Sequence, residues 1–471
     1  MPRMIDRRAM LATGAGAAAA LALNPACAAS AKRPNILFIM ADDLGYADLS
    51  CYGREDYATP AIDGLAKQGM RFTSAYANSP VCSATRTALI TGRYQYRLPV
   101  GLEEPLSTRP LGLPPEHPTL PSLLRKAGYG TALIGKWHLG LLPDYGPLKS
   151  GYDHFFGFRA GGVDYFTHSF GKKHDLWDGD TRAEETGYLT DLLADRTIGV
   201  IEHYAKNDRP FFVSLHFSAP HWPWEGPEDR AVADRLAKEP NGLKGMLNFD
   251  GGTMKTYAEM VTRMDQGIAR VLASLKRLGL DRDTIVVFTS DNGGERFSKT
   301  WPFSGRKSEL LEGGVRVPCI VRWPGVAKPG SVSDVPVMSM DWLPTFITAA
   351  GAATHPAFPS DGRDIAAQIA GAPMADRALF WRYKYFAQEA HRQGAWKYLK
   401  IGENRFLFNV IEDPMERANL MQREPERFRR MTAAYDAWNA TMLPLDPKSD
   451  SHGWSGDTSA DRYGIPTSPR P

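Results

Sequence analysis

The sequence contains little cysteine, with four residues in a chain of 471. So few cysteines cannot act as a disulfide scaffold in a chain of this length, which must instead be stabilised by a large hydrophobic core. Cys51 and Cys319 could pair with each other, but we expect them to be buried as separate thiols. Cys82 then remains as a thiol available for chemistry.

A strong net charge, a long apolar run and an internal repeat are also missing. The formal net charge is only +3, which gives no electrostatic footprint for a nucleic-acid partner. No stretch is apolar enough to predict a membrane span. Apolar residues make up 43% of the chain and charged residues 23%, which is ordinary globular composition. The length predicts one large domain and a smaller second one.

Residues 1–31 have the pattern of an export signal. Arg7 and Arg8 precede a charge-free stretch rich in alanine and glycine, and small residues around Cys27 offer a cleavage site. Paired arginines before a mildly hydrophobic stretch favour a twin-arginine-like signal, with an ordinary secretory signal as the alternative. We therefore predict a bacterial protein that is periplasmic or secreted.

Apolar runs of strand length alternate with amphipathic segments, which predicts an α/β fold. Helices are expected at 60–67, after a threonine cap and with proline first, and at 257–278, ending before glycine. The pattern changes near residue 375, where short strand-like runs and a helix over 425–442 predict an α+β subdomain over 376–471. The buried strands are expected at 35–40, 131–134, 211–217 and 284–290.

Polar residues follow each of these buried strands. Asp42 and Asp43 come after the first strand, and Asp291 and Asn292 after the last. Ligands in open α/β sheets bind outside the carboxyl ends of the strands, so these oxygen donors should meet. Adjacent acids at one strand end would repel each other without a cation, and hard oxygen ligands favour Ca²⁺ or Mg²⁺. A turn or helix cap is the simpler reading of one Asp pair, but two pairs favour a metal site.

Cys82 and Arg86 are spaced one helical turn apart in the stretch Cys-Ser-Ala-Thr-Arg. If Cys82 begins a helix, both side chains lie on one face, beside unpaired backbone N–H groups that favour an anion. Such a pair is a weak signal by itself, because most buried cysteines are core residues.

Taken together, these motifs resemble the formylglycine-dependent sulfatases of the alkaline phosphatase superfamily, of the arylsulfatase type. The resemblance covers most of the chain after the signal, with a catalytic domain over 32–375. It implies a large mixed, mostly parallel sheet flanked by helices, and a small antiparallel sheet in the C-terminal subdomain. It is carried by seven ordered segments: 34–46, 82–86, 135–140, 219–221, 290–293, 305–307 and 312–318.

The resemblance implies hydrolysis of an aryl or carbohydrate sulfate ester through a sulfo-enzyme intermediate. Cys82, oxidised to formylglycine by a formylglycine-generating enzyme, would be the metal-bound nucleophile. The implied metal, Ca²⁺ or Mg²⁺, would be held by Asp42, Asp43, Asp291 and Asn292 together with the modified Cys82. The remaining implied roles are sulfate binding by Arg86, Lys136 and Lys307, proton acceptance by Asp291 and His138, and protonation of the leaving oxygen by His221 or Lys307.

The motif at Cys82 departs from the family's usual Cys-x-Pro-Ser-Arg, with Ala84 and Thr85 in place of proline and serine. Neither residue carries the chemistry, so the departure concerns recognition by the modifying enzyme. Two other functions stay open at this point. One is a phosphonate monoester or phosphodiester hydrolase, and the other is an inactive protein that binds sulfated glycans through an unmodified Cys82.

A glycine- and aromatic-rich region over 151–168 resembles the segment that flanks the substrate pocket in family members acting on amino-sugar sulfates. It makes Asp164, Tyr165 and His168 candidate substrate ligands, although packing would equally explain them. Trp222 and Trp224, just after His221, could stack on a sugar ring or fill the pocket wall. His216 is assigned to the core.

Overall fold

The computed structural model describes residues 33–102, 110–248 and 251–445. The predicted export signal at 1–31 lies outside these residues, as does the tail beyond residue 445. Among the described helices, none is both long enough and apolar enough to cross a membrane. Cys51, Cys82 and Cys319 are free thiols, as predicted, although Cys51 is only half-buried.

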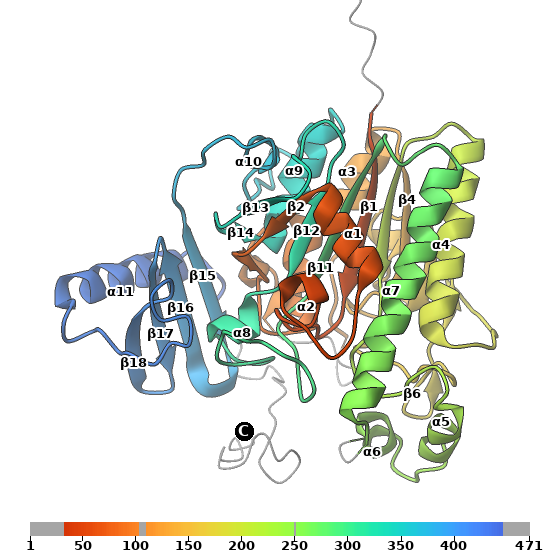
Figure 1. Cartoon of the computed structure of the whole chain (residues 1–471), viewed down its shortest axis with the longest axis horizontal. Coiled ribbons are helices and arrows are strands. Elements are labelled where there is room, and N and C mark those ends of the chain that lie inside the picture. The colour runs from red at the N-terminus through yellow and green to blue at the C-terminus, as the bar shows by residue number, and fades with distance from the viewer. Residues whose placement is uncertain (1–32, 103–109, 249–250, 446–471) are drawn as a thin grey trace, which may run out of the picture. The chain divides into compact units, whose positions relative to one another are not determined.

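A ten-stranded mixed sheet forms the centre of the fold (Figure 1). Its five central strands run parallel, in the order β11, β1, β10, β4, β5, and antiparallel strands extend both edges. In sheet order the strands are β13 (Ser331–Ser333), β2 (Met70–Phe72), β12 (Cys319–Arg322), β11 (Thr284–Ser290), β1 (Asn35–Ala41), β10 (Phe211–His216), β4 (Gly130–Lys136), β5 (His154–Phe158), β8 (Trp177–Asp178) and β9 (Thr181–Arg182).

Helices cover both faces of this sheet, because its central strands are apolar on both sides. In β1, Leu37 and Ile39 join the core under one set of helices, whereas Ile36 and Phe38 join the core under the other set. The first set is α1 (Pro60–Gln68), α4 (Leu189–Lys206) and α7 (Met254–Arg277), and the second is α2 (Cys82–Thr91), α3 (Leu120–Lys126) and α9 (Trp342–Ala349).

The predicted strands and helices agree closely with the structure. All four predicted buried strands are central strands of the sheet. The predicted helix at 257–278 begins earlier, at Met254, because the Thr253 side chain accepts a hydrogen bond from Thr256 N–H and so caps the helix. The remaining short elements lie in connections: β3 (Ala75–Tyr76), β6 (Ser169–Phe170), β7 (Lys173–His174), β14 (Val337–Met338), α5 (Arg230–Leu236), α6 (Gly242–Leu247), α8 (Glu312–Val315) and α10 (Ala366–Ile369).

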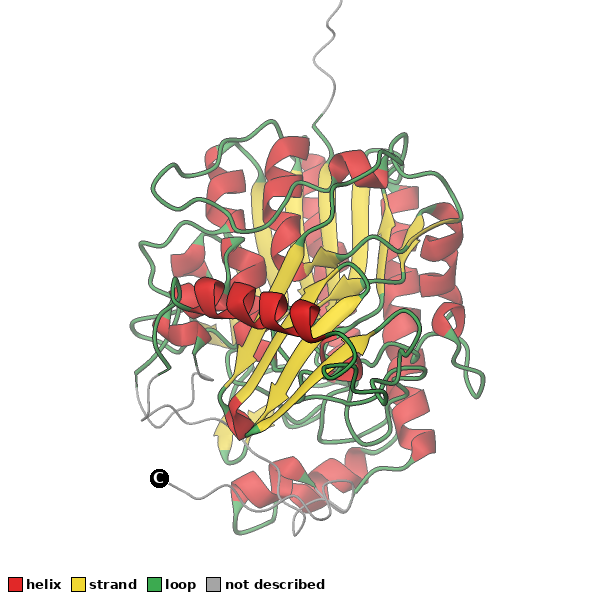
Figure 2. Cartoon of the chain, turned by 90° about the vertical axis from the view of Figure 1, so that its left-hand side faces the viewer, coloured by secondary structure: helices red, strands yellow, loops and turns green. Residues whose placement is uncertain are grey.

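The C-terminal part forms a separate four-stranded antiparallel sheet (Figure 2). A helix, α11 (Pro425–Asn439), packs across one face of it, where Met431 and Tyr435 meet Tyr398 and Leu407. The prediction for this region missed one strand, β16, because its sequence is polar. The four strands are β15 (Ala378–Tyr383), β16 (Gln388–Gln393), β17 (Trp396–Ile401) and β18 (Asn404–Asn409).

A buried cluster of charged side chains links this small sheet to α8, a short helix in a connection of the ten-stranded sheet. Lys397, on β17, lies 3.0 Å from a carboxylate oxygen of Glu312 and 2.9 Å from one of Glu416. Against the effect of burial, Lys397 and Arg316 lower the pKa of Glu312 to about 2. Burial and the charge of Glu312 raise the pKa of Glu416 to about 7. Two acids therefore share one lysine, and Glu416 holds a proton at mildly acidic pH.

This cluster should make stability depend on pH. The folded protein keeps a proton on Glu416 up to about pH 7, whereas the unfolded chain releases it near its ordinary pKa of 4.5. The free energy of unfolding should therefore fall as pH rises from about 4.5 to 7, by at most about 1.4 kcal/mol per pH unit. Glu416→Gln should remove this contribution and make the measured slope shallower, which thermal unfolding of both proteins from pH 5 to 8 would measure. Parallel curves would contradict the assignment.

Candidate active site

Two neighbouring strand ends bring three carboxylates and one amide together. β1 and β11 run parallel, with Ala41 opposite Ser290, so Asp42–Asp43 and Asp291–Asn292 leave the sheet side by side. Asp43 N–H donates to Asp291 Oδ1 at 3.2 Å, and Asn292 Nδ2 donates to Asp43 Oδ1 at 2.7 Å. All four side chains are buried.

Cys82 begins α2, with Val81 as the N-cap, and its sulfur faces these acids. Cys82 Sγ lies 3.3 Å from Asp42 Oδ1 and 3.9 Å from Asp43 Oδ1. Burial and the charge of Asp42 raise the pKa of the Cys82 thiol well above its ordinary value. An unmodified thiol here is therefore protonated at neutral pH and is a poor nucleophile.

Three buried cations surround the carboxylates, and each comes from a different element. Arg86, on α2, donates to Asp291 Oδ2 at 2.7 Å, and Lys136, the last residue of β4, donates to Asp42 Oδ2 at 2.6 Å. Lys307, in the loop between β11 and α8, donates to Asp43 Oδ2 at 2.8 Å. The two lysines have pKa values raised by these carboxylates in spite of burial, so both carry a charge at neutral pH.

The donor set fits a hard divalent cation. Ligand atoms of Asp42, Asp43, Cys82 and His221 all lie within 4.8 Å of one another. Asn292 Oδ1 is buried and has no hydrogen-bond partner among the described residues, which an ion would supply. Burial and the charge of Asp291 raise the pKa of Asp42 to about 8, so further positive charge is needed to keep Asp42 ionised at neutral pH. The pKa of Asp291 is instead lowered, because Arg86 and Lys136 outweigh its burial.

Two buried histidines complete the site, and both are neutral. Burial, together with Lys136 and Arg86, holds the pKa of His138 well below its ordinary value, and neither ring nitrogen has a partner among the described residues. Burial and Lys307 likewise lower the pKa of His221. His221 Nδ1 lies 2.7 Å from the Trp222 carbonyl, to which it must donate, so the unprotonated Nε2 faces Asp43 Oδ2 at 3.6 Å.

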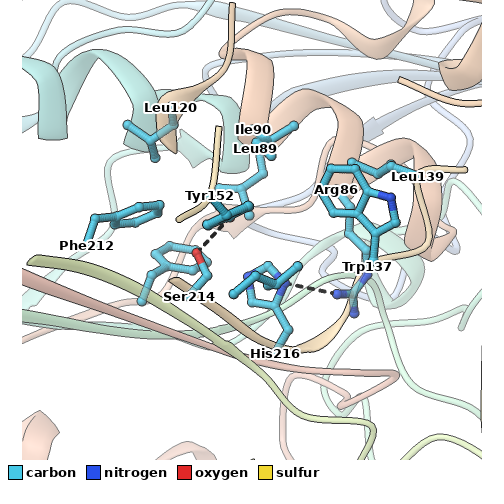
Figure 3. A pocket seen from close by; sticks show the side chains of 12 residues that line it. Arg86, Leu89, Ile90, Leu120, Trp137, Leu139, Tyr152, Phe212, Ser214 and His216 are labelled. Atoms are coloured by element: carbon cyan, nitrogen blue, oxygen red, sulfur yellow. Dashed lines mark hydrogen bonds between the residues drawn. The ribbon is translucent and has the colours of Figure 1, made fainter. Parts of the chain in front are cut away.

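The sequence analysis assigned His216 only to the core, but the structure shows that it also contacts a residue of the site. It is buried at the end of β10, and its Nδ1 lies 3.3 Å from Arg86 Nη1 (Figure 3). Burial and the nearby Arg86 lower its pKa to about 3, so His216 is neutral, and its Nδ1 also lies 3.3 Å from the Lys136 carbonyl. The cavity beside them, of about 20 Å³, is too small for a substrate. A sequence signal was available, because His216 lies near the carboxyl end of the predicted buried strand at 211–217.

The three candidate substrate ligands use polar atoms of their side chains in hydrogen bonds to the backbone of the chain itself. Asp164 Oδ1 accepts from Phe166 N–H and Thr167 N–H, within its own turn. Tyr165 Oη donates to the His221 carbonyl at 2.9 Å, and His168 Nε2 contacts the Gly187 carbonyl at 3.1 Å. A role in substrate binding stays a prediction for these three residues.

The two tryptophans after His221 differ in what they contact. Trp222 is half-buried, and its ring centre lies 5.9 Å from Lys307 Nζ, one of the three cations of the site. Trp224 is buried against Phe297 and beneath the guanidinium of Arg296. Trp222 is therefore the better placed of the two to meet a substrate, whereas Trp224 fills the wall behind it.

Comparisons with known proteins agree with this geometry. A family model described as Sulfatase matches residues 34–352. Mouse (Mus musculus) arylsulfatase J is 29% identical over 90% of this chain and 79% of its own length, and mouse steryl-sulfatase is 32% identical over 88% and 83%. The crystal structure of Ps i-CgsB in complex with k-i-k-neocarrahexaose superposes with a TM-score of 0.79 and 29% identity, covering 92% of this chain and 98% of that one.

The chain therefore belongs to the sulfatase family, within the alkaline phosphatase superfamily. It is a hydrolase that acts on sulfate esters.

Proposed function

We propose that the chain hydrolyses a carbohydrate sulfate, with Cys82 oxidised to formylglycine as the nucleophile. The observation that carries the proposal is the position of Cys82 Sγ, 3.3 Å from Asp42 Oδ1 at the buried carboxylate cluster. Burial and the charge of Asp42 raise the pKa of the Cys82 thiol and so weaken it as a nucleophile, and oxidation would supply a hydroxyl at this position instead. Thr85, which replaces serine in the family motif, exchanges hydrogen bonds with the Ser79 backbone and so stabilises the turn before Cys82.

Asp42, Asp43, Asp291 and Asn292 would hold a divalent cation, Ca²⁺ in preference to Mg²⁺. Carboxylate and amide oxygens are the ligands that these ions prefer, and the unpartnered Asn292 Oδ1 supplies one of them. When bound, the cation would lower the pKa of a coordinated hydroxyl on the oxidised Cys82 side chain.

The other polar side chains would bind the sulfate group and move protons. Arg86, Lys136 and Lys307 would neutralise the sulfate oxygens, where a preorganised donor contributes about 3 kcal/mol to transition-state stabilisation. Asp291, ionised because its pKa is lowered, would accept the proton of the attacking hydroxyl. His138 is neutral, and neither of its ring nitrogens is hydrogen-bonded to a described residue. It would therefore accept a proton in the later step that releases sulfate.

Lys307 is a better candidate than His221 for protonating the leaving oxygen. Its pKa is well above the ordinary value, mainly because Asp43 outweighs burial, so it carries a proton to donate. His221 is neutral, and its Nε2 on the side of the carboxylates has a lone pair in place of a proton. His221 would then serve as an acceptor or ligand beside Asp43.

A sulfated carbohydrate is the substrate class that the surroundings support best. Half-buried Trp222 lies against Lys307 and could stack on a sugar ring next to the sulfate. The Ps i-CgsB structure, at 29% identity, contains k-i-k-neocarrahexaose. We also propose that residues 1–31 direct export, which would place the enzyme in the periplasm or outside the cell.

Paired aryl esters test the proposal. The kcat/KM for an aryl sulfate should exceed that for the aryl phosphate with the same leaving group, as expected of a member of the sulfatase family. Steady-state rates on both esters, with the divalent cation present, measure this preference. A higher kcat/KM for the phosphate would favour the phosphohydrolase alternative and contradict the proposal.

A further inference from the structure

Lys307 differs from the other two cations of the site in the way its backbone is held. Arg86 lies on a helix and Lys136 on a central strand, whereas Lys307 lies in a turn with no regular structure. Its own N–H donates to the Gly294 carbonyl at 3.0 Å, and the N–H of Ser308 donates to the Pro80 carbonyl at 2.9 Å. Ser308 has a φ of 70°, in the left-handed region that costs a non-glycine residue free energy. Surrounding contacts must therefore keep this turn in place.

The side chain of Gln388, in the C-terminal sheet, supplies two such contacts. Gln388 is the first residue of β16, and only 2% of it is exposed. Its Nε2 donates to the Ser308 carbonyl at 2.8 Å, and its Oε1 accepts from Leu310 N–H at 2.8 Å. One amide thus bridges two backbone groups of the Lys307 turn. Because both ends of the amide are engaged, its orientation is fixed.

Gln388 also fixes the hairpin tip from which it comes. Its Nε2 donates a second hydrogen bond, at 3.0 Å, to the Tyr385 carbonyl. The next two residues, Phe386 and Ala387, have φ values of 57° and 43°, so the tip is itself held in a left-handed conformation. Gly402 N–H donates to the Phe386 carbonyl and holds the other side of the tip. Gln388 therefore lies where two left-handed turns meet, one from each sheet.

We propose that Gln388 is a positioning residue for Lys307, through which the C-terminal sheet completes the active site. This inference rests on the role proposed for Lys307 in binding sulfate and protonating the leaving oxygen. Gln388 does not contact the reacting groups, and it acts by keeping the Ser308–Leu310 backbone in the conformation that directs Lys307 Nζ to Asp43. Without the amide, two buried backbone groups lose their partners and the turn can relax. A displacement of about 1 Å at a reacting group can cost up to 10²-fold in rate.

Gln388→Leu removes the amide with little change in side-chain size. We expect its kcat/KM on the ester that the parent hydrolyses to fall about 10- to 100-fold. Gln393→Leu is the matched control, because it makes the same substitution at an exposed position on the same strand, and its kcat/KM should equal that of the parent. Thermal unfolding establishes that both variants are folded at the assay temperature.

A double-mutant cycle separates positioning from a general structural effect. In a Lys307→Met background, Gln388→Leu should change kcat/KM less than twofold, because the group it positions is already gone. A full 10- to 100-fold loss in that background, or no loss in the single variant, would overturn the inference.

Hydrogen exchange tests the same contact without any turnover. Exchange of the Leu310 amide, followed by mass spectrometry of its peptide, should be at least tenfold faster in Gln388→Leu than in the parent and in Gln393→Leu. Equal exchange rates in the three proteins would overturn the inference whatever the substrate is. If exchange is faster in Gln388→Leu but the parent hydrolyses no sulfate ester, the result would support the role of Gln388 in holding this backbone. It would then contradict only the proposed function.

Discussion

Replacing Cys82 by alanine should lower kcat by about four orders of magnitude or more and leave the fold intact. A loss of this size is expected for a covalent nucleophile, because the residual binding groups cannot supply a substitute for the attacking atom. Stability should change little, because the substitution removes one small side-chain atom from the wall of a polar site. Single-turnover kinetics on an aryl sulfate and thermal unfolding of the same preparation measure both effects.

Cys51→Ala is a suitable control for this variant. Cys51 is a free, half-buried thiol that belongs to a different part of the fold, where its N–H donates to Asp63. Its replacement should leave kcat unchanged. Mass spectrometry of the Cys82 peptide from active parent protein should find the thiol converted to an aldehyde. Normal turnover by Cys82→Ala, or by parent protein with an unaltered thiol, would contradict covalent catalysis at this position.

Asp291→Asn should lower the bound metal content and kcat together, kcat by roughly 10²- to 10³-fold. The substitution keeps the size of the side chain and an oxygen donor, but it removes a charge that the cation requires. It also replaces the carboxylate that pairs with Arg86 at 2.7 Å, so a buried guanidinium loses its closest counter-charge and stability should fall as well. Elemental analysis after dialysis, steady-state kinetics and thermal unfolding give the three readouts.

The exposed Asp234 provides the matched control for the charge change, because Asp234→Asn makes the same substitution on the surface of α5. Its metal content, kcat and unfolding temperature should match those of the parent. Full metal occupancy with a normal rate in Asp291→Asn would refute the assignment of Asp291 as a ligand and proton acceptor. Restoration of the rate by excess cation would show that the defect lies in metal affinity.

The central sheet could be predicted because its signals are local. Strands such as β1 and β11 are continuous apolar runs followed at once by acids, and strand ends of a parallel sheet meet at one edge. The same reasoning predicts that Asp42 and Asp291 meet at this edge, and the register of β1 and β11 brings them together. The same rule applies to His216, which also ends a central strand and contacts Arg86, but the sequence analysis assigned this residue only to the core.

Other features could not be predicted, because they depend on contacts between distant parts of the chain. β16 is polar in sequence, and it is a strand because it pairs with both β15 and β17. Gln388 reaches a loop 80 residues away, and no periodicity marks such a contact. The hydrogen bond from Tyr165 to the backbone carbonyl of His221 is also invisible in the sequence. Through this bond Tyr165 supports the site, whether or not it contacts a sugar.

The burial of Cys82 has a consequence for the order of events in the cell. Only 1% of this residue is exposed, and every residue of α2 around it is buried. An oxidising enzyme needs direct access to the side chain, which the finished fold denies. If Cys82 is oxidised as proposed, the aldehyde must be installed while the chain is still open, during or soon after its synthesis. A molecule that folds before it meets the oxidising enzyme would be trapped as an inactive thiol form.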